Sequence, residues 1–349
     1  MPFLNIIMEP MAGGYGARPH ADGMDTGGLF CIPMGRIPDV EMTEFLYPVL
    51  ALWRREEPDS GGPGRRRGGV SASVAITAHG SSLPMGLILA AAGKAVSQNA
   101  GLSGGHPGNT GLDVIARGSR VAEMLAAGRM PAELAEISDS LEPAQNYAAS
   151  YLAPGEVLMM RWQGGGGYGD PLTREPEAVA HDLREGKITR EAARDVYGVV
   201  LGGDAVDNAA TAAERRRLRT TRENRSRALR AASGRKIDVA GARRLDDNLV
   251  EVAGDDGHVI ACRHCGEVLG DARAGTGTDS GLALAIYEGP PTDAGPQIIA
   301  TAADYIDAPV VFRQYCCPGC WTAVYSAVVP ADHDDGVARL TLLTPAAAG

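Results

Sequence analysis

The segments CRHCGEV (residues 262–268) and QYCCPGCW (residues 314–321) hold five of the six cysteines in this 349-residue chain. Each segment contains a C-x2-C pair, Cys262 with Cys265 and Cys317 with Cys320. A tight turn of this spacing directs two thiolates at one ion, and four sulfur ligands close a tetrahedral site that has no open position for substrate. The sequence therefore predicts a structural zinc site at these four cysteines, and mononuclear iron is the alternative.

The neighbours of these cysteines qualify the prediction. Cys316 is an alternative ligand to Cys317, but only Cys317 gives the two-residue spacing in which Pro and Gly let a turn close. Gly266 follows the first pair and permits a left-handed backbone, whereas Trp321 follows the second pair and adopts that backbone less easily. We therefore expect the second turn to be distorted. Three histidines lie nearby and are expected in solvent rather than on the metal: His258, His264 and His333.

Composition narrows the classes of function. With 43 acidic against 33 basic residues the formal net charge is -10, which argues against nucleic-acid binding. The apolar run SSLPMGLILAAAG (residues 81–93) is too short for a membrane span and contains Pro84. The segment MPFLNIIMEPMAGGYG (residues 1–16) has no basic leader. We therefore expect a cytoplasmic protein without membrane partners, and in the cytoplasm thiols stay reduced and available to a metal.

The fold class expected is α+β. The 46 glycines and 22 prolines favour strands and turns over long helices. Residues 1–205, the extent of the family resemblance given below, are expected to be β-rich and to end in a helical hairpin. The hairpin is the segment REPEAVAHDLREGKITREAARDVYGVVL (residues 174–201), with Pro176 in the first turn, Thr189 as the second N-cap and Gly198 as the stop. A short strand at 199–201 follows it. The inward side chains of the helical hairpin are expected to be Val179, Leu183, Ile188 and Val196.

The rest of the chain divides in two. Residues 206–248 are predicted to be a charged helical linker, in which AATAAERRRLRTTRENRSRALRAAS (residues 209–233) offers only Leu218 and Leu229 as apolar anchors. A helix that docks on an acidic partner is the alternative. Residues 249–349 are predicted to be a zinc-ribbon-like β domain, with strands in GLALAIYEG (281–289), PVVFRQY (309–315) and TAVYSAVVP (322–330).

Three glycine-rich stretches raise binding questions. Gly164, Gly166 and Gly169 satisfy G-x-G-x-x-G, but Pro171 intervenes before any helix, so a nucleotide loop is not expected. The segment PHADGMD (residues 19–25) offers His20, Asp22 and Asp25 as metal ligands, although turn formation explains it as well. The third stretch, with Gly61, Gly62, Gly64 and Arg65–Arg67, is either a phosphate cradle or, as we favour, a surface hairpin with a basic tip. Gly13, Gly14 and Gly16 are expected to be turn residues.

Four blocks in order carry a family resemblance: MEPMAGGYGARPHADGMDTGG (8–28), PDSGGPGRRRGG (58–69), GGGGYGDP (164–171) and PEAVAHDLREGKITREAARDVYGVVL (176–201). Over about the first 205 residues the chain resembles the C-terminal portion of the hydantoinase B/oxoprolinase family. The cysteine-containing tail resembles the zinc-binding gamma subunit of acetone carboxylase and the related small subunit of acetophenone carboxylase.

The resemblance implies partners. In these systems a hydantoinase A-like ATPase subunit phosphorylates the substrate, and the B-type subunit carries out the second step. The family's catalytic metal site uses His and Asp residues of the N-terminal half, which we expect a second polypeptide to supply. ATP and a catalytic divalent metal are therefore expected on partner subunits, and no catalytic residue of this chain is assigned. Open β surface left by the absent half implies an obligate partner.

Three functions remain open. The gamma-like tail favours a subunit of an ATP-dependent carboxylase acting on a small ketone. A subunit of an ATP-dependent amidohydrolase that opens hydantoins or related cyclic amides is the second. A non-catalytic, zinc-containing assembly subunit is the third.

Overall fold

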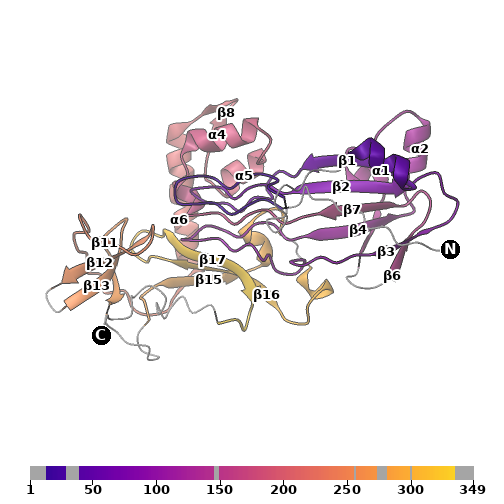
Figure 1. The fold of residues 1–349 in the computed structure, drawn as a ribbon. Coiled ribbons are helices and arrows are strands. Elements are labelled where there is room, and N and C mark those ends of the chain that lie inside the picture. Colours follow the sequence, from indigo (N-terminus) through magenta and orange to yellow (C-terminus); the bar gives the residue numbers. More distant parts are fainter. Residues whose placement is uncertain are drawn as a thin grey trace.

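The computed structural model describes residues 13–28, 39–144, 149–254, 257–272, 281–298 and 301–334 (Figure 1). Cys31 lies outside these ranges. The described residues form many strands and few helices, and a small cysteine-rich β region occupies the C-terminal part, which confirms the α+β class. None of the helices in these ranges is long and apolar enough to cross a bilayer.

A five-stranded antiparallel sheet lies at one end of the molecule (Figure 1). Its strand order is β1 (Val49–Glu56), β2 (Ala72–Ala78), β7 (Val157–Arg161), β4 (Leu112–Arg117) and β5 (Ser140–Pro143). Side chains alternate between its faces, so Val74 and Ile76 enter one core while Ala75 enters the other. The first core is covered by the two-stranded antiparallel sheet of β3 (Met85–Ile88) and β6 (Ala149–Leu152), and the second by α2 (Val121–Ala126) and α3 (Leu134–Ile137).

A bundle of extended glycine-rich segments continues from this sheet toward the C-terminal strands (Figure 1). It contains residues 13–28, 57–71, 97–111 and 162–170, and we call it the glycine bundle. Its segments exchange backbone hydrogen bonds: Gly165 N–H donates to Gly69 O at 2.9 Å, and Gly62 N–H donates to Gly165 O at 2.8 Å. A Cβ atom on Gly165 would lie 1.9 Å from Tyr15 O. The spacing admits only glycine, as at the axis of the collagen triple helix.

The glycine bundle corrects two expectations. Gly61, Gly62 and Gly64 are buried within it, so they do not form a surface hairpin with a basic tip. Gly13 and Gly14 are required by close backbone contacts, since a Cβ atom at either would approach a carbonyl oxygen to 2.4 Å or less, and they are not hairpin turn residues. Gly164 and Gly166 have the same role, since their Cβ atoms would lie 2.1 Å from Ser60 O and 2.0 Å from Ala100 O, and the Gly164 N–H donates to Asn109 Oδ1 at 2.5 Å.

Two short helices and one longer helix follow the bundle. α4 (Pro176–Arg184) and α5 (Arg190–Asp195) form the expected hairpin, with Pro176 in the first turn and the Thr189 side chain accepting from Ala192 N–H. Its core holds Val179, Ile188, Tyr197 and Val199, flanked by Leu183 and Val196. The strand begins later than expected, at β8 (Leu201–Gly202), and pairs with β9 (Ala205–Val206). α6 (Asn208–Arg225) then leads to the C-terminal strands.

Two four-stranded antiparallel sheets make up the C-terminal region. One contains β10 (Arg227–Ala228), β15 (Ala285–Gly289), β16 (Val310–Cys316) and β17 (Ala323–Pro330). The other contains β11 (Arg243–Arg244), β12 (Leu249–Gly254), β13 (Gly257–Cys262) and β14 (Val268–Asp271). Two 3-10 turns, η2 (Pro291–Ala294) and η3 (Ala302–Asp304), lie between β15 and β16. Both sheets contribute to one core, which includes Leu249, Ile260, Leu284 and Tyr315.

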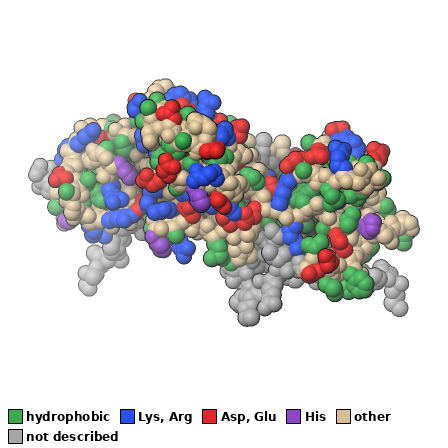
Figure 2. All heavy atoms as spheres, turned by 90° about the horizontal axis from the view of Figure 1, so that it is seen from above, with side chains coloured by type: hydrophobic (Ala, Val, Ile, Leu, Met, Phe, Trp, Pro, Cys, Tyr) green, Lys and Arg blue, Asp and Glu red, His purple; other side chains and the backbone are tan. Residues whose placement is uncertain are grey.

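The outer surface carries charges of both signs. Figure 2 shows acidic and basic side chains interspersed across one face of the molecule, with apolar side chains between them. Among exposed apolar residues, Met42, Phe45 and Leu46 lie on α1 (Val40–Leu46), and Phe45 is 82% exposed. Neighbouring exposed apolar side chains of this kind are typical of a protein contact site.

Candidate metal centre and the adjoining cavity

The four predicted cysteines come together at the edge of the C-terminal sheets. Their Sγ atoms all lie within 4.8 Å of one another. The Cys262–Cys320 sulfur distance is 3.8 Å and the Cys265–Cys317 distance is 3.7 Å. Zinc–sulfur bonds of about 2.3 Å in a regular tetrahedron place sulfur atoms about 3.8 Å apart. The donor set and its spacing therefore fit a tetrathiolate zinc ion, which would hold the two sheets together.

The two cysteine turns share one backbone design. Gly266 N–H donates to Cys262 O and Trp321 N–H donates to Cys317 O, both at 2.9 Å. Gly266 has φ of 74° and Trp321 has φ of 59°, so both lie in the left-handed region. The expected distortion of the second turn is absent, because Trp321 adopts the conformation that glycine supplies in the first turn.

The alternative ligands lie elsewhere. The Cys316 sulfur is 3.7 Å from Gln314 Oε1 and does not join the cluster, whereas Cys317 does. His264 Nε2 contacts Asn248 Oδ1 at 2.9 Å, and His258 pairs with Glu251. Within the described ranges, no histidine belongs to the four-sulfur group.

The protonation state of the four cysteine thiols depends on whether a metal ion is bound. The pKa of Cys317 is raised, chiefly by its hydrogen bonds with Cys262 and Cys320, and burial adds to this. A divalent cation reverses this preference, because thiolate is the form that binds metal.

A buried ion pair connects the centre to the glycine bundle. Arg222 of α6 donates to both carboxylate oxygens of Asp170, at 2.6 and 2.9 Å, and to Trp321 O at 3.0 Å. Asp170 also accepts from Leu172 N–H at 2.9 Å and from Ala323 N–H at 2.8 Å. Burial alone would raise the pKa of Asp170, but the charge and hydrogen bonds of Arg222 hold it below its usual value.

The charged helix is thus partly buried. Thr211, Arg215, Leu218 and Arg222 follow one another at intervals of three or four residues and form one face of α6. Arg215 donates to the carbonyls of Arg174 and Tyr197, in addition to the contacts of Arg222. The sequence predicted Leu218 as an apolar anchor but did not predict that Arg215 and Arg222 are partly buried. Their spacing of three and four residues from Leu218, which places them on the same helix face, could have indicated it.

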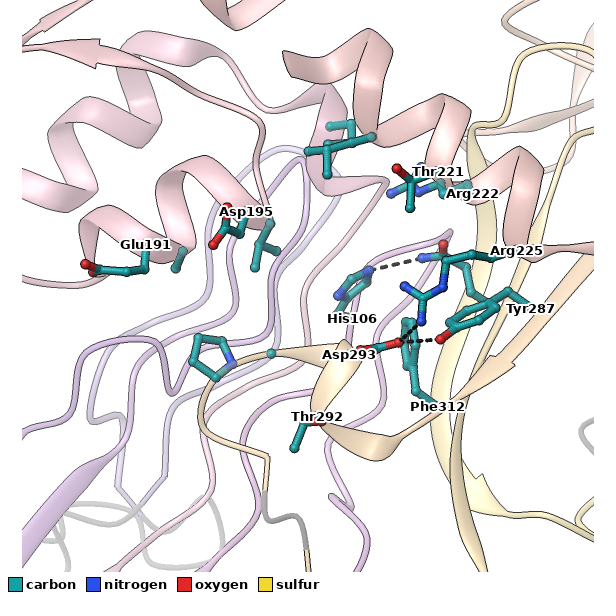
Figure 3. Close-up of a pocket in the computed structure, with 17 residues that line it drawn as sticks. His106, Glu191, Asp195, Thr221, Arg222, Arg225, Tyr287, Thr292, Asp293 and Phe312 are labelled. Carbon is teal, nitrogen blue, oxygen red and sulfur yellow. Dashed lines mark hydrogen bonds and ion pairs between the residues drawn. The ribbon is translucent and has the colours of Figure 1, made fainter.

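A cavity of about 400 Å³ lies beside this junction, between α5, α6, η2 and β16 (Figure 3). His106 of the glycine bundle points into it (Figure 3). On one wall the Arg225 guanidinium lies 4.1 Å from the Tyr287 ring centroid and 2.5 Å from Asp293. The Tyr287 hydroxyl also donates to Asp293. The volume suits a small molecule.

The charges around the cavity are unfavourable for an anion. Arg222 and Arg225, the two arginines of the wall, are both paired with carboxylates. Glu191 and Asp195 project from α5 at the opposite end and are exposed (Figure 3). A phosphorylated ligand would therefore meet net negative charge.

His106 is buried and neutral. Its Nδ1 atom is 2.9 Å from Ala294 O, which assigns the proton to Nδ1, and its Nε2 atom then accepts from the Gln314 amide at 3.2 Å. Burial lowers the pKa of His106 to about 4. His106 therefore joins the glycine bundle to β16 as an uncharged link.

The metal site considered at His20, Asp22 and Asp25 is not formed in the part of the chain that the structure describes. Asp22 accepts two hydrogen bonds of 2.7 Å from Arg174, and Asp25 accepts one of 2.9 Å from Arg67. Burial alone would raise the pKa of both carboxyls, but these arginines lower it. Arg67 is buried and used in this way, and Arg65 pairs with Asp247, so these two arginines do not present a phosphate cradle.

Known proteins resemble this chain over part of their length. The hydantoinase B/oxoprolinase family model matches residues 4–171. The acetone carboxylase alpha subunit of Xanthobacter autotrophicus (strain ATCC BAA-1158 / Py2) is 30% identical over 234 residues, covering 61% of this chain and 30% of that protein. The acetophenone carboxylase delta subunit of Aromatoleum aromaticum (strain DSM 19018 / LMG 30748 / EbN1) is 33% identical over 197 residues, covering 53% and 28%.

Two further similarities concern a lactamase and a solved structure. The caprolactamase subunit beta of Pseudomonas jessenii is 30% identical over 220 residues, covering 61% of this chain and 34% of that protein. The nucleotide-free structure of acetone carboxylase superimposes with a TM-score of 0.55 at 28% identity, covering 62% of this chain and 31% of that chain. This chain spans between 28% and 34% of the length of these curated relatives. Residues 4–171 therefore match the hydantoinase B/oxoprolinase family, and the carboxylase subunits above are similar to this chain over part of their length.

Proposed function

We propose that this chain is a subunit of an ATP-dependent carboxylase of the acetone/acetophenone carboxylase type. The observation that carries the proposal is the 234-residue similarity to an acetone carboxylase alpha subunit, in a chain that also builds a four-cysteine centre against the matched segment. Zinc held by Cys262, Cys265, Cys317 and Cys320 would have a structural role, because four sulfur ligands leave no open position. The gamma-like module would then comprise residues 249–349, joined to residues 1–205 through segment 206–248, which contains α6 and the short strands β10 and β11.

ATP and the catalytic metal are assigned to partners. The cavity beside the metal centre has both arginines paired and two exposed carboxylates at its end, so it is a poor site for a phosphorylated intermediate. We place phosphorylation on a hydantoinase A-like ATPase subunit. The catalytic divalent metal would come from the remaining portion of the B-type subunit, and the substrate would be a small ketone.

The exposed surface supports an obligate partner. α1 has no buried residue, and its Met42, Phe45 and Leu46 side chains are more than half exposed. Because such neighbouring apolar groups are rarely left in water, a partner polypeptide that covers α1 would stabilise the assembled state.

Cyclic-amide hydrolysis is the second candidate, and the similarity to caprolactamase subunit beta favours it. In that case phosphorylation would activate an amide carbonyl for attack by water, and the same division of labour between subunits would hold.

Purification of the tagged chain with its native partners tests the proposal. Mass spectrometry should identify an ATPase subunit and a hydantoinase-B-type polypeptide. The complex should then incorporate labelled bicarbonate into an acid-stable product only with ATP and acetone or acetophenone. ATP-dependent opening of caprolactam or hydantoin without carbon fixation would select the hydrolase. A complex that contains an ATPase subunit but has neither activity would contradict both enzymes and leave the assembly role.

A further inference from the structure

We propose that Asp170 and Arg222 hold the second cysteine turn in its metal-binding conformation. By this proposal the glycine bundle, through Asp170, helps to set the metal affinity of a centre whose ligands all lie in the C-terminal sheets. The inference depends on the fit of the four sulfur atoms to a metal and is independent of the reaction that the complex catalyses.

The second turn needs support that the first does not. Gly266 adopts its left-handed conformation freely, whereas Trp321 at φ of 59° is strained because its Cβ atom crowds the backbone. The Trp321 carbonyl accepts a hydrogen bond of 3.0 Å from Arg222. Arg222 thus fixes the residue that directly follows the ligand Cys320.

Asp170 fixes the other end of the same short segment. It accepts from Ala323 N–H at 2.8 Å, two residues beyond Trp321. Between these anchors, Thr322 O accepts from Cys317 N–H at 3.0 Å, and the Thr322 hydroxyl lies 3.3 Å from the Cys320 sulfur. Segment 321–323 therefore reaches both ligands of the second turn, and the Asp170–Arg222 pair holds it at each end.

The pair is built for positioning. Asp170 is 1% exposed, and the Arg222 side chain is 13% exposed. The planar guanidinium spans both carboxylate oxygens and the Trp321 carbonyl together, which an ammonium group cannot reproduce. Residues that orient metal ligands in this way typically change metal affinity about 10- to 100-fold when they are replaced.

Transfer of zinc from the loaded full-length chain to the chelator 4-(2-pyridylazo)resorcinol tests the proposal. Arg222→Gln and Arg222→Lys should each lower zinc affinity by about 10- to 100-fold. Arg217→Gln is the matched control, since Arg217 lies on the same helix and pairs with Glu214 at the surface. Its affinity should equal that of the wild type. If Arg222→Gln does not fold, Asp170→Asn provides the measurement.

Cobalt substitution separates positioning from general stability. The d–d absorption bands of a Co²⁺ tetrathiolate report the arrangement of its sulfur ligands, and we expect them to shift in Arg222→Gln but not in Arg217→Gln. Reduced affinity with unchanged bands would overturn the positioning role. Wild-type zinc affinity in both Arg222→Gln and Asp170→Asn would overturn the proposal altogether.

The coupling must also act in reverse. Zinc removal from the wild-type chain should speed hydrogen exchange at the Leu172 and Ala323 amides, both of which donate to Asp170. Unchanged exchange at these two amides would contradict the link.

Discussion

Replacement of Gly165 by Ala should disrupt the glycine bundle. The added Cβ atom would lie 1.9 Å from Tyr15 O, whereas ordinary contact begins at 3.4 Å, so the segments would have to separate by 3.4 − 1.9 = 1.5 Å. Hydrogen bonds of 2.9 Å to Gly69 O and 2.8 Å from Gly62 N–H would then break. Each leaves buried polar groups without partners at about 1–3 kcal/mol, so we expect a loss of about 2–6 kcal/mol. That is a large part of the usual stability of about 5–15 kcal/mol.

Urea unfolding followed by circular dichroism measures this loss, and Gly16→Ala is the matched control. Gly16 belongs to the same bundle, but its Cβ atom would lie 3.8 Å from Gly166 O, an ordinary contact. The free energy of unfolding of Gly16→Ala should stay within about 0.5 kcal/mol of the wild type. If Gly165→Ala unfolds at the same urea concentration as Gly16→Ala, the close packing inferred for the bundle is wrong.

Three further predictions concern the cysteine centre and the buried residue His106. Cys316→Ser should retain stoichiometric zinc by plasma mass spectrometry while Cys317→Ser loses it, because only the Cys317 sulfur lies in the cluster; equal zinc content would contradict the ligand assignment. Trp321→Gly should retain zinc longer than Trp321→Val in a chelator assay, since a β-branched residue is strained at positive φ. His106 has a pKa of about 4 when folded against 6.5 as the ordinary value, so the unfolded chain takes up the proton first and stability falls as pH drops through this range. His106→Gln should reduce that fall between pH 6.5 and 4.5 by about 2–3 kcal/mol in urea unfolding, and an unchanged pH dependence would count against the buried neutral form.

Local patterns predicted the parts of the structure that local chemistry determines. Thr189 caps α5 and the C-x2-C pairs form turns because each depends on residues a few positions apart. The prediction for the glycine bundle was wrong because the bundle depends on residues that are far apart in the sequence. Gly62 and Gly165 are neighbours only after the chain has folded, and each taken alone resembles a turn glycine.

The burial of Arg222 was not predicted for a similar reason. The charge-rich sequence around Arg222 is typical of a solvated helix, and its burial follows from a carboxylate 52 residues away. The prediction of a distorted second turn was wrong because of the same arginine. Arg222 donates a hydrogen bond to the Trp321 carbonyl, and this bond holds Trp321 in the left-handed backbone conformation. In the sequence, Asp22 is a possible metal ligand. In the folded chain, both of its carboxylate oxygens accept hydrogen bonds from Arg174, which lies far along the sequence.

At Gly104 the glycine bundle and the C-terminal sheets contact each other backbone to backbone. A Cβ atom on Gly104 would lie 2.0 Å from Ala323 O, so backbone contacts backbone at this point. The Asn248 amide donates to Ser103 O and to Ala323 O, at 2.5 and 3.2 Å. Ala323 is also the residue whose N–H donates to Asp170. Because one residue beside the metal centre is held from three directions by groups outside its own strand, the centre cannot rotate relative to the glycine bundle. A partner that binds the glycine bundle would therefore meet the cysteine centre in one fixed orientation.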